Sequence, residues 1–247
     1  MIKIIPLSEG VFTIGHDKIF HPFDPETEEL NDRPTGSLLV EVQPFLLVTQ
    51  QDVILLDTGL GFHIGNDLQL HYNLAKQGYR PEDVTKVLLS HLHKDHAGGM
   101  SFKDAAGNSK PSFPEAMYYI YKAEAEGAIQ DTSLSYIPEE LNPVLQSDQV
   151  VWLEGENGII DENIRFTHSG GHSKNHIVFL YDDGETRIFF GGDEAPQLKQ
   201  MKIKYVAKYD YDGKKAMQLR EQYAEAGKKG DWQFLFYHDV KTPVSRL

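Results

Sequence analysis

Short apolar runs separated by turn residues dominate the first sixty positions of the chain. The runs at 2–7, 11–15, 37–42, 44–50 and 52–59 predict β-strands. Residues 66–78 predict a helix instead, with Asn66 or Asp67 near its start and Gly78 beyond its end. The run at 84–90 predicts a strand that leads directly into a cluster of histidines. Further strands are predicted at 118–121, 150–153, 163–167, 175–181, 186–190 and 233–237, and helices at 122–129 and 213–227.

This order of strands and helices predicts an α/β fold in which sheets carry helices on their outer faces. With 40% hydrophobic residues, a chain of 247 residues can bury a sizeable core. No Pro/Ser/Gly-rich spacer, low-complexity tract or internal repeat divides it, so we expect one domain over residues 1–247. Pro6 breaks the first apolar run, and no run reaches membrane-spanning length, so we expect a soluble, cytoplasmic protein.

The charge balance narrows the classes of partner. The chain has 24 basic and 37 acidic residues, which gives a net charge of −13. A phosphate backbone would be repelled by such a surface. We therefore expect a small-molecule substrate and neither nucleic acid nor membrane as a partner. The chain contains no cysteine, so any metal ion must be held by histidine, aspartate or glutamate.

The histidine cluster HLHKDH occupies residues 91–96 and is followed by a glycine pair at 98–99. His91 and His93 are two residues apart in an extended segment, so their side chains point to the same side. Asp95 and His96 are neighbours where a short helix can begin, and they point in different directions. We therefore expect the first two histidines to bind one metal ion, and Asp95 and His96 to bind a second. The glycines let the backbone pass closely beneath the site; the alternative is a solvated surface cluster.

Three further candidate ligands follow predicted strands or glycine turns: His172 in SGGHSKNH, Asp193 in FFGGDEA and His238 in FLFYHDV. Loops at the ends of strands gather around a common site. Each residue alone is as consistent with an ordinary loop position as with a metal ligand. Together with the cluster at 91–96, they indicate a metal site built from distant parts of the chain.

The combined pattern of HxHxDH at 91–96, GH at 171–172, GGD at 191–193, the late His238 and LLDTG at 55–59 resembles the metallo-β-lactamase superfamily. The resemblance covers nearly the whole chain and implies an αββα sandwich with a dinuclear metal site at one edge of the two sheets. It implies a ligand set for each metal and one bridge: His91, His93 and His172 for the first metal, Asp95, His96 and His238 for the second, and Asp193 as the bridge. It also implies that Asp57 braces a ligand by a hydrogen bond; the alternative is a turn-stabilising role before Gly59.

A hydroxide shared by two divalent ions would make such a site catalytic. Two ions bring four positive charges, and two carboxylates with the hydroxide remove three, leaving about one for an incoming oxygen. The hydroxide can then attack a carbonyl or phosphoryl centre, so Asp95 and Asp193 are the candidate catalytic residues. Zinc is the expected metal, with iron, cobalt or manganese as alternatives. A non-catalytic scaffold would be expected to have lost ligands, and all seven are present.

Several branches of the superfamily fit the chain less well. Class B β-lactamases place a cysteine in the second site, flavodiiron relatives have glutamate in place of His93, and nucleases usually need a basic surface. Only nine residues follow His238, which leaves no room for the helical domain of glyoxalase II-like thioesterases. The resemblance is greatest to the compact acyl-homoserine lactonases, through SHLHxDHAGG, the spacing of His172 and His176, and FLFYHD. It implies hydrolysis of an ester-like bond, in particular of a lactone such as an N-acyl-homoserine lactone, with phosphotriesters or phosphodiesters as the alternative.

Two positions depart from the lactonase pattern. Pro196 stands where those lactonases commonly have a tyrosine that can hydrogen-bond the substrate carbonyl. The turn at 169–172 is Ser-Gly-Gly-His, where their sequence is Thr-Pro-Gly-His. Tyr205 and Tyr209 are candidates to supply another donor, with ordinary packing roles as the alternative.

The polar segment at 15–36 is too long for a simple hairpin, and we expect it to fold over the pocket. There it would contribute Ile19, Phe20 or Phe23 to an apolar wall for an acyl chain; the alternative is a solvated acidic loop. The other histidines are not expected to be ligands: His176 on a strand in a core or ligand-bracing role, His168 in a loop, and His63 and His71 unassigned.

Overall fold

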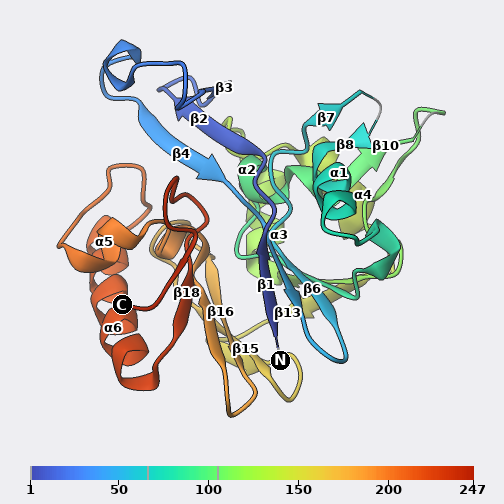
Figure 1. Ribbon diagram of the computed structural model, residues 1–247. Coiled ribbons are helices and arrows are strands. Elements are labelled where there is room, and N and C mark those ends of the chain that lie inside the picture. Colours follow the sequence, from blue (N-terminus) through green and yellow to red (C-terminus); the bar gives the residue numbers. More distant parts are fainter. Residues whose placement is uncertain (1, 66, 105) are drawn as a thin grey trace.

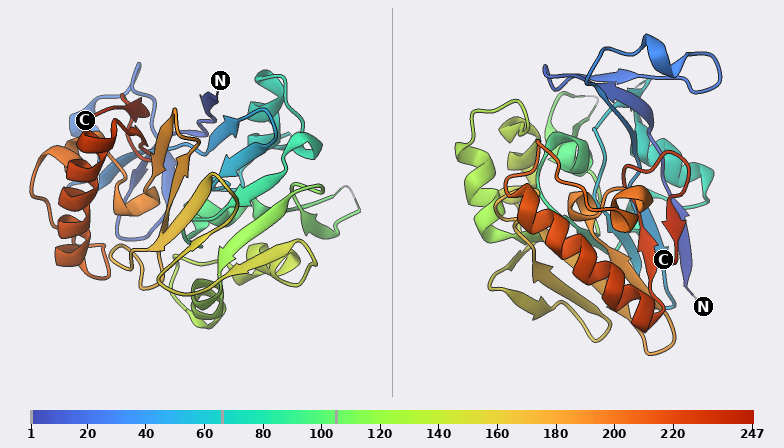
Figure 2. Two further views of the ribbon diagram at one scale, coloured as in Figure 1. Left: turned by 90° about the horizontal axis from the view of Figure 1, so that it is seen from below. Right: turned by 90° about the vertical axis from the view of Figure 1, so that its left-hand side faces the viewer.

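Two six-stranded β-sheets lie face to face in the computed structural model, which describes residues 2–65, 67–104 and 106–247 (Figure 1). Helices cover the outer face of each sheet, so the chain forms four layers (Figures 1 and 2). The predicted αββα sandwich is therefore confirmed. No helix in the described part of the chain is long and apolar enough to cross a membrane.

The first sheet comes from the N-terminal part of the chain. Its strands lie in the order β1 (Lys3–Pro6), β5 (Phe45–Val48), β6 (Val53–Leu56), β9 (Lys86–Leu88), β12 (Met117–Tyr121) and β13 (Val150–Leu153). β1, β5 and β6 are antiparallel neighbours, whereas β6, β9, β12 and β13 are parallel. Parallel strands need crossover connections, and these contain α1 (Gln69–Lys76), α3 (Lys122–Gln130) and α4 (Pro138–Leu145).

The second sheet comes from the C-terminal part. Its strands lie in the order β14 (Asn157–Ile159), β15 (Ile164–His168), β16 (Ile177–Asp182), β17 (Arg187–Phe190), β18 (Gln233–Leu235) and β19 (Val244–Ser245). Neighbours are antiparallel except β17 and β18. The crossover between this parallel pair contains the outer helices α5 (Leu198–Lys202) and α6 (Gly213–Gly230). Figure 2 shows α6 lying across the outside of the sheet.

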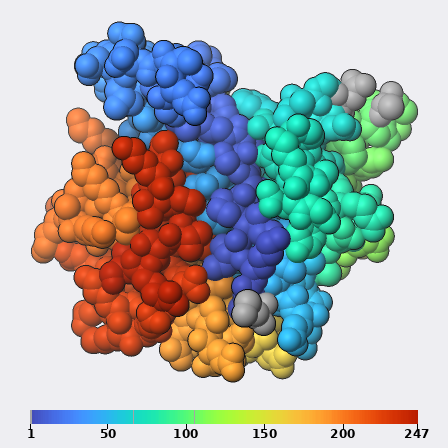
Figure 3. Space-filling model, viewed as in Figure 1, coloured from blue at the N-terminus to red at the C-terminus, as the bar shows by residue number. Residues whose placement is uncertain are grey.

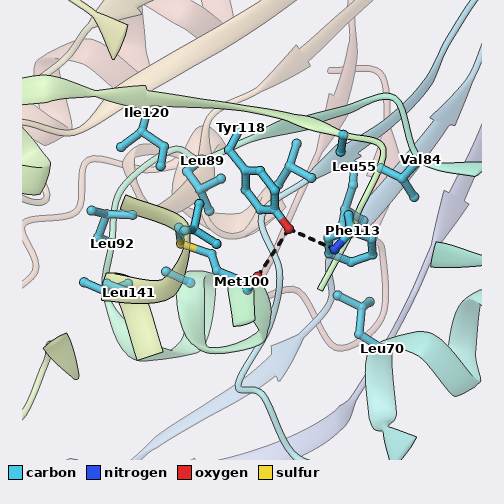
Figure 4. Packing of buried hydrophobic residues seen from close by; sticks show 14 of the residues in the cluster. Leu55, Leu70, Val84, Leu89, Leu92, Met100, Phe113, Tyr118, Ile120 and Leu141 are labelled. Carbon is cyan, nitrogen blue, oxygen red and sulfur yellow. Dashed lines mark hydrogen bonds between the residues drawn. The ribbon is translucent and has the colours of Figure 1, made fainter. Parts of the chain in front are cut away.

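Three apolar clusters hold the layers together. One lies between the two sheets and contains Phe45 and Phe190, which are both almost fully buried. A second fills the space between the first sheet and its helices. There the Tyr118 hydroxyl donates a hydrogen bond to the Met100 carbonyl at 3.2 Å and accepts one from the Phe113 amide at 3.0 Å (Figure 4). The third packs α5 and α6 against the second sheet. Burial of apolar surface on both faces of each sheet thus stabilises the sandwich.

The strand directions gather five loops at one edge of the sandwich. β6 and β9 are parallel, so their carboxyl ends coincide. β15 and β17 both pair antiparallel with β16, and β18 is parallel to β17, so these three strands also end together. Side chains that follow these five strands can therefore meet between the sheets.

A three-stranded sheet projects beyond this edge and is called the flap here. It consists of β2 (Gly10–Ile14), β3 (Phe20–Pro22) and β4 (Leu38–Val42), and a 3₁₀ turn at Leu30–Asp32 joins the last two. Figures 1 and 3 show the flap standing above the segment that contains α5. The segment at 15–36 was predicted as a loop over the pocket, and much of it belongs to this flap.

Several element predictions need correction. The helix predicted at 66–78 begins at Gln69, because Asp67 belongs to the hairpin of β7 (His63–Ile64) and β8 (Asp67–Leu68); Asn66 lies outside the described residues. The strand predicted at 52–59 ends at Leu56, because the chain turns at Asp57, which has a φ of 56°. Helices α4 and α5 and the hairpin of β10 (Ser101–Lys103) and β11 (Ser109–Pro111) were not predicted. Pro143 inside α4 hides its helical pattern.

Candidate metal centre

The predicted ligands lie together at the loop edge described above. His91 and His93 follow β9, and Asp95 and His96 belong to the one-turn helix α2 (Lys94–Ala97). The other three follow strands of the second sheet: His172 after β15, Asp193 after β17 and His238 after β18. The structure thus brings all seven predicted residues to one place.

The glycine pair after α2 allows the chain to pass beneath this place. A Cβ on Gly98 would overlap the carbonyl of Leu60, and one on Gly99 would overlap the carbonyl of Thr58. Any larger residue would therefore push α2 away from the loop after β6. This confirms the expected close approach of the backbone beneath the site.

His91, His93 and His172 form what is called the first group. The Nε2 atom of His91 lies 3.0 Å from Nδ1 of His93, and Nε2 of His172 lies 3.2 Å from the same Nδ1 atom. Tetrahedral ligands about 2.0–2.1 Å from a zinc ion are about 3.3 Å apart. The three nitrogens thus have the spacing of ligands around one ion, and the three residues form a group able to hold a metal.

Asp95, His96 and His238 form the second group, which is likewise able to hold a metal. Asp193 lies between the two groups. Its Oδ2 atom is 3.1 Å from Nε2 of His172, while its Oδ1 atom is 3.2 Å from Nε2 of His96 and 3.0 Å from Nε2 of His238. One oxygen of this carboxylate therefore faces each group, which is the arrangement that a bridging ligand requires.

Two buried atoms indicate that the second group fits a cation. Nε2 of His96 and Oδ1 of Asp193 are buried and form no hydrogen bond, although they lie only 3.2 Å apart. Unpaired buried polar atoms are costly and rare in native proteins. Each atom also lies near a further atom of the second group: Nε2 of His96 is 3.7 Å from Oδ2 of Asp95, and Oδ1 of Asp193 is 3.0 Å from Nε2 of His238. The donor set of imidazoles and carboxylates suits a divalent transition metal.

The outward nitrogens of four histidines are held by other groups. Nδ1 of His91 lies 3.1 Å from the Ser90 hydroxyl, that of His96 2.7 Å from Asp57, that of His172 3.0 Å from Asp210, and that of His238 2.6 Å from the carbonyl of Glu41. Such partners fix the tautomer and the ring orientation, so that Nε2 is free to bind a metal.

Asp57 acts as a brace in the way the resemblance implied. The Ser90 amide donates to its Oδ1 at 2.7 Å, and the Ser90 hydroxyl donates to its Oδ2 at 2.7 Å. Because Oδ2 also holds His96, this fully buried carboxylate connects the ends of β6 and β9 to the second group. The alternative role as a turn residue is also present, since its φ is 56°.

Sequence reasoning missed further supports. Glu124 on α3 accepts from the amide of Leu92, between the two histidines of the first group, at 3.1 Å. Tyr237 donates to the Asp95 carbonyl at 2.7 Å, and its ring stacks on the His96 imidazole. Both residues lie far from the histidine cluster in sequence. The sequence carries only a weak signal for them: Glu124 lies near the start of a predicted helix, and Tyr237 lies at the end of a predicted strand.

A buried arginine supports the His172 side of the site. Arg220 on α6 is 2% exposed and lies 3.9 Å from the carboxylate of Asp210, which holds His172. Its guanidinium also donates to the carbonyls of Glu194 at 3.2 Å and Tyr205 at 2.7 Å. Helix α6 is thereby tied to the loop that carries one ligand of the first group.

Burial and neighbouring charges set the protonation of these groups. Burial lowers the pKa of His91 and of His93 well below the usual range, and neighbouring imidazoles add to the shift, so both rings are neutral. Burial also opposes a proton on His96, but the carboxylates of Asp193 and Asp95 outweigh it and raise its pKa well above the usual range. An environment that holds a buried proton so firmly also favours a metal cation.

The family model described as the metallo-beta-lactamase superfamily matches residues 39–237 of this chain. The chain belongs to the metallo-β-lactamase superfamily. The match contains six of the seven predicted ligands, and His238 follows its last residue directly.

Relatives of this superfamily member include lactonases. An N-acyl homoserine lactonase from Bacillus cereus is 24% identical over 228 residues, which cover 84% of this chain and 85% of the lactonase. A probable metal-dependent hydrolase from Staphylococcus aureus has a TM-score of 0.76 at 21% identity, covering 99% of this chain and 92% of the other. The dizinc quorum-quenching lactonase AidC, solved with a product, has a TM-score of 0.73 at 20% identity, covering 99% and 90%. The predicted likeness to the lactonase-type branch and the predicted class of metal-dependent hydrolase are confirmed.

A cavity of about 760 Å³ opens in front of the two groups. Pro196 lines it, and so do Tyr205 and Tyr209, the two candidates for a substitute donor. The ring of Tyr209 lies 6.1 Å from that of His172, and its hydroxyl accepts a hydrogen bond from the Gln200 amide at 3.4 Å. The hydroxyl hydrogen of Tyr209 is thus available to another acceptor.

The flap contributes one side of the cavity. Phe20 lines it, as expected for an apolar wall. Ile19 is 52% exposed and does not line it, and Phe23 is buried beside a different hollow with Phe12 and Phe62. The expectation is therefore wrong for Ile19 and Phe23. Only Phe20 belongs to β3, whereas Ile19 and Phe23 flank this strand on either side.

The histidines that were not expected to be ligands lie around the site or away from it. His176 lies just before β16. Its Nε2 atom accepts a hydrogen bond from the Asp193 amide at 3.2 Å, and its Nδ1 atom lies 2.9 Å from the Ser169 hydroxyl. It therefore braces the bridging residue, as the sequence suggested. His168 is the last residue of β15 rather than a loop residue, and it lies against the Lys174 carbonyl. His71 lies against the Ser112 carbonyl, and His63 is exposed in β7.

Proposed function

We propose that this chain is a dinuclear metal-dependent hydrolase that opens a lactone ring, such as that of an N-acyl-homoserine lactone. The observation that carries the proposal is the position of Asp193, whose two carboxylate oxygens face two different groups of ligands. A structural zinc site is closed by four protein ligands. Two adjacent groups of three that share one carboxylate instead fit a catalytic pair of ions.

The ligand assignment follows the two groups. We assign three histidines to the first ion, Asp95, His96 and His238 to the second, and Asp193 to both. Imidazole and carboxylate ligands suit zinc, with iron, cobalt or manganese as alternatives. When bound, the ions would supply a water nucleophile at neutral pH and positive charge for the oxygens of the reacting ester.

The chain's own residues prepare that chemistry in three ways. The braced imidazoles present Nε2, or Nδ1 in His93, without needing to turn. Asp95 and Asp193 line the cavity and lie among the candidate metal ligands, so we assign both to the reacting part of the site. In the reaction a water oxygen bonds to the carbonyl carbon, the ring C–O bond breaks, and the released alcohol oxygen takes up a proton.

The cavity fits an acyl substrate. Its volume of about 760 Å³ lies within the usual range for small-molecule sites. Phe20, Leu38, Leu39, Val40 and Ile203 supply apolar side chains to its wall. The match over 84% of the chain to an N-acyl homoserine lactonase supports the same substrate class.

A cytoplasmic location remains a prediction.

The decisive experiment measures ring opening by protein with a quantified two metal ions per chain. N-hexanoyl- and N-dodecanoyl-homoserine lactone are incubated with this protein and with a chelated sample, and the acid released is titrated. We expect opening that is lost on chelation and restored by zinc. No opening in a fully metallated sample would contradict the proposal, and phosphotriester and phosphodiester chromogens tested beside the lactones would then decide the predicted alternative.

One substitution tests the role of the bridge. Asp193→Ala should abolish turnover, and Asp193→Asn, which keeps the shape, should lose metal and activity together. Asp148→Asn is the matched control, because Asp148 is exposed and far from the ligands in the chain. Retained turnover in the alanine variant would refute the proposed mechanism.

A further inference from the structure

Lysines from separate parts of the chain line the cavity. Four of its lining residues are lysines, and they come from different elements: Lys18 from the flap, Lys94 from α2, Lys174 from the β15–β16 loop and Lys199 from α5. Among the described residues, the ammonium groups of these four lysines form no ion pair with a carboxylate; the lysines that do are others. Lys18, Lys174 and Lys199 are exposed, so their ammonium groups are available to a ligand.

The carboxylates of the same cavity are almost all engaged. Asp95 and Asp193 belong to the ligand groups, Asp210 holds His172, and Glu124 accepts hydrogen bonds from Leu92 and Tyr136. The one exposed carboxylate in the lining is that of Asp131. Three exposed positive charges therefore face one negative charge, in a protein whose net charge is −13.

The flap lysine lines the cavity of the candidate metal centre. Lys18 has a φ of 58°, a conformation that non-glycine residues rarely adopt, and it lines the cavity while its neighbour Ile19 is turned to solvent. His93 and His172 of the first group line the same cavity as Lys18.

A positive field continues outward from α5. From Lys199 to Lys215 six lysines are exposed, and one of them, Lys204, pairs with Glu221 at 3.2 Å. The acidic residues in this segment are Asp210, which is turned inward to His172, and Asp212, which caps α6. This segment lies below the flap on the face shown in Figure 3. A local positive field on an acidic protein attracts anions to the cavity.

We propose that the substrate carries an anionic group, a carboxylate or a phosphate, at the end remote from its hydrolysed bond, and that Lys18, Lys174 and Lys199 hold this group. The inference rests on the proposed function and narrows it, since a simple N-acyl-homoserine lactone is neutral. All three lysines line one cavity of small-molecule size, and all three are exposed.

The test compares lactones of equal length that differ only at the tail. N-hexanoyl-homoserine lactone is paired with the N-adipoyl form, which ends in a carboxylate, and with a form that ends in a phosphate. Exposed ion pairs are individually weak, so three together should favour the anionic tails by about tenfold in kcat/KM at low salt. The preference should shrink in 0.5 M salt, and the ratio between the two anionic tails tells carboxylate from phosphate.

Two triple variants assign the preference to these lysines. Lys18→Gln, Lys174→Gln and Lys199→Gln together should bring the ratio of anionic to neutral substrate to about one. The control replaces the exposed Lys76, Lys103 and Lys228 by glutamine, which changes the net charge equally, and should keep the wild-type ratio. A wild-type protein without preference, or a preference that survives in the first triple variant, overturns the proposal.

A binding measurement separates this proposal from the proposed function. Calorimetric titration of the metallated protein with ring-opened N-adipoyl- and N-hexanoyl-homoserine needs no turnover. About tenfold tighter binding of the adipoyl form, lost in the first triple variant, supports the anion site even if no lactone is opened. Equal dissociation constants overturn it even if neutral lactones are opened.

Discussion

Replacing the Asp57 carboxylate by an amide should weaken metal binding at the second group without unfolding the protein. In Asp57→Asn the amide oxygen still accepts from the Ser90 amide, as Oδ1 does now at 2.7 Å. The amide nitrogen, however, cannot accept from Nδ1 of His96, which now lies 2.7 Å from Oδ2. The His96 proton then moves to Nε2, the nitrogen that faces the second group.

The structure sets the expected size of the effect. Loss of such a brace costs about 10- to 100-fold in metal affinity, or about 1.4–2.7 kcal/mol. Asparagine tolerates the left-handed conformation that Asp57 adopts, with a φ of 56°, so the backbone is not strained. Asp57→Ala should be worse, because the buried Ser90 amide loses its acceptor at a further cost of about 1–3 kcal/mol in folding stability.

The assay is competition for zinc with a chromophoric chelator, which gives one dissociation constant for each site. We expect one dissociation constant of Asp57→Asn, that of the second group, to rise about 10- to 100-fold relative to the unchanged protein. The other dissociation constant should change little. Urea unfolding of the metal-free protein should separate the alanine from the asparagine variant, with Asp148→Asn as the control. Wild-type affinity at both sites in Asp57→Asn would refute the reasoning and leave Asp57 as a turn residue.

Three further changes have defined outcomes. Arg220→Met removes the cation beside the buried Asp210 carboxylate, which then keeps only His172, and removes two hydrogen bonds to backbone carbonyls. It should lower the free energy of unfolding by about 3–5 kcal/mol, measured in urea; wild-type stability would contradict this. Burial raises the pKa of Glu9 to about 8, above that of the unfolded chain, so stability should fall as pH rises from 5 to 8. Glu9→Gln should remove about 1.4 kcal/mol per pH unit of that fall in metal-free protein, and parallel curves would exclude it. If Tyr209 replaces the missing tyrosine, Tyr209→Phe should lower kcat/KM about a hundredfold and Tyr205→Phe little; equal effects would argue against that role.

The sequence predicted the site better than its surroundings. The cluster at 91–96 sits in one short segment after a strand, so spacing alone indicated where His91 and His93 point. The distant ligands were found because each follows a strand or a glycine turn. Their assignment to particular ions remains a prediction, as does the single domain.

The supports of the site could not be predicted because they come from afar. Glu124 is 32 residues from the Leu92 amide that it holds, and Asp210 is 38 residues from His172. No local pattern connects such pairs, and their contacts exist only once α3 and the segment before α6 pack on the sheets. Two strands of the flap, β2 and β4, match the strands predicted at 11–15 and 37–42, but their pairing was not predicted because 23 residues separate them. β3 was missed because it is only three residues long and lies in the polar segment 15–36.

The placement of the ligands also affects how the chain folds. Each group combines residues that follow strands of the first sheet with at least one that follows a strand of the second, and the His93–His172 contact alone spans 79 residues. Bound ions would therefore close long loops and link the two halves of a chain that has no cysteine for disulfides. Bound metal ions would then restrict the unfolded chain as a covalent crosslink does. Neither half made alone would contain a complete site.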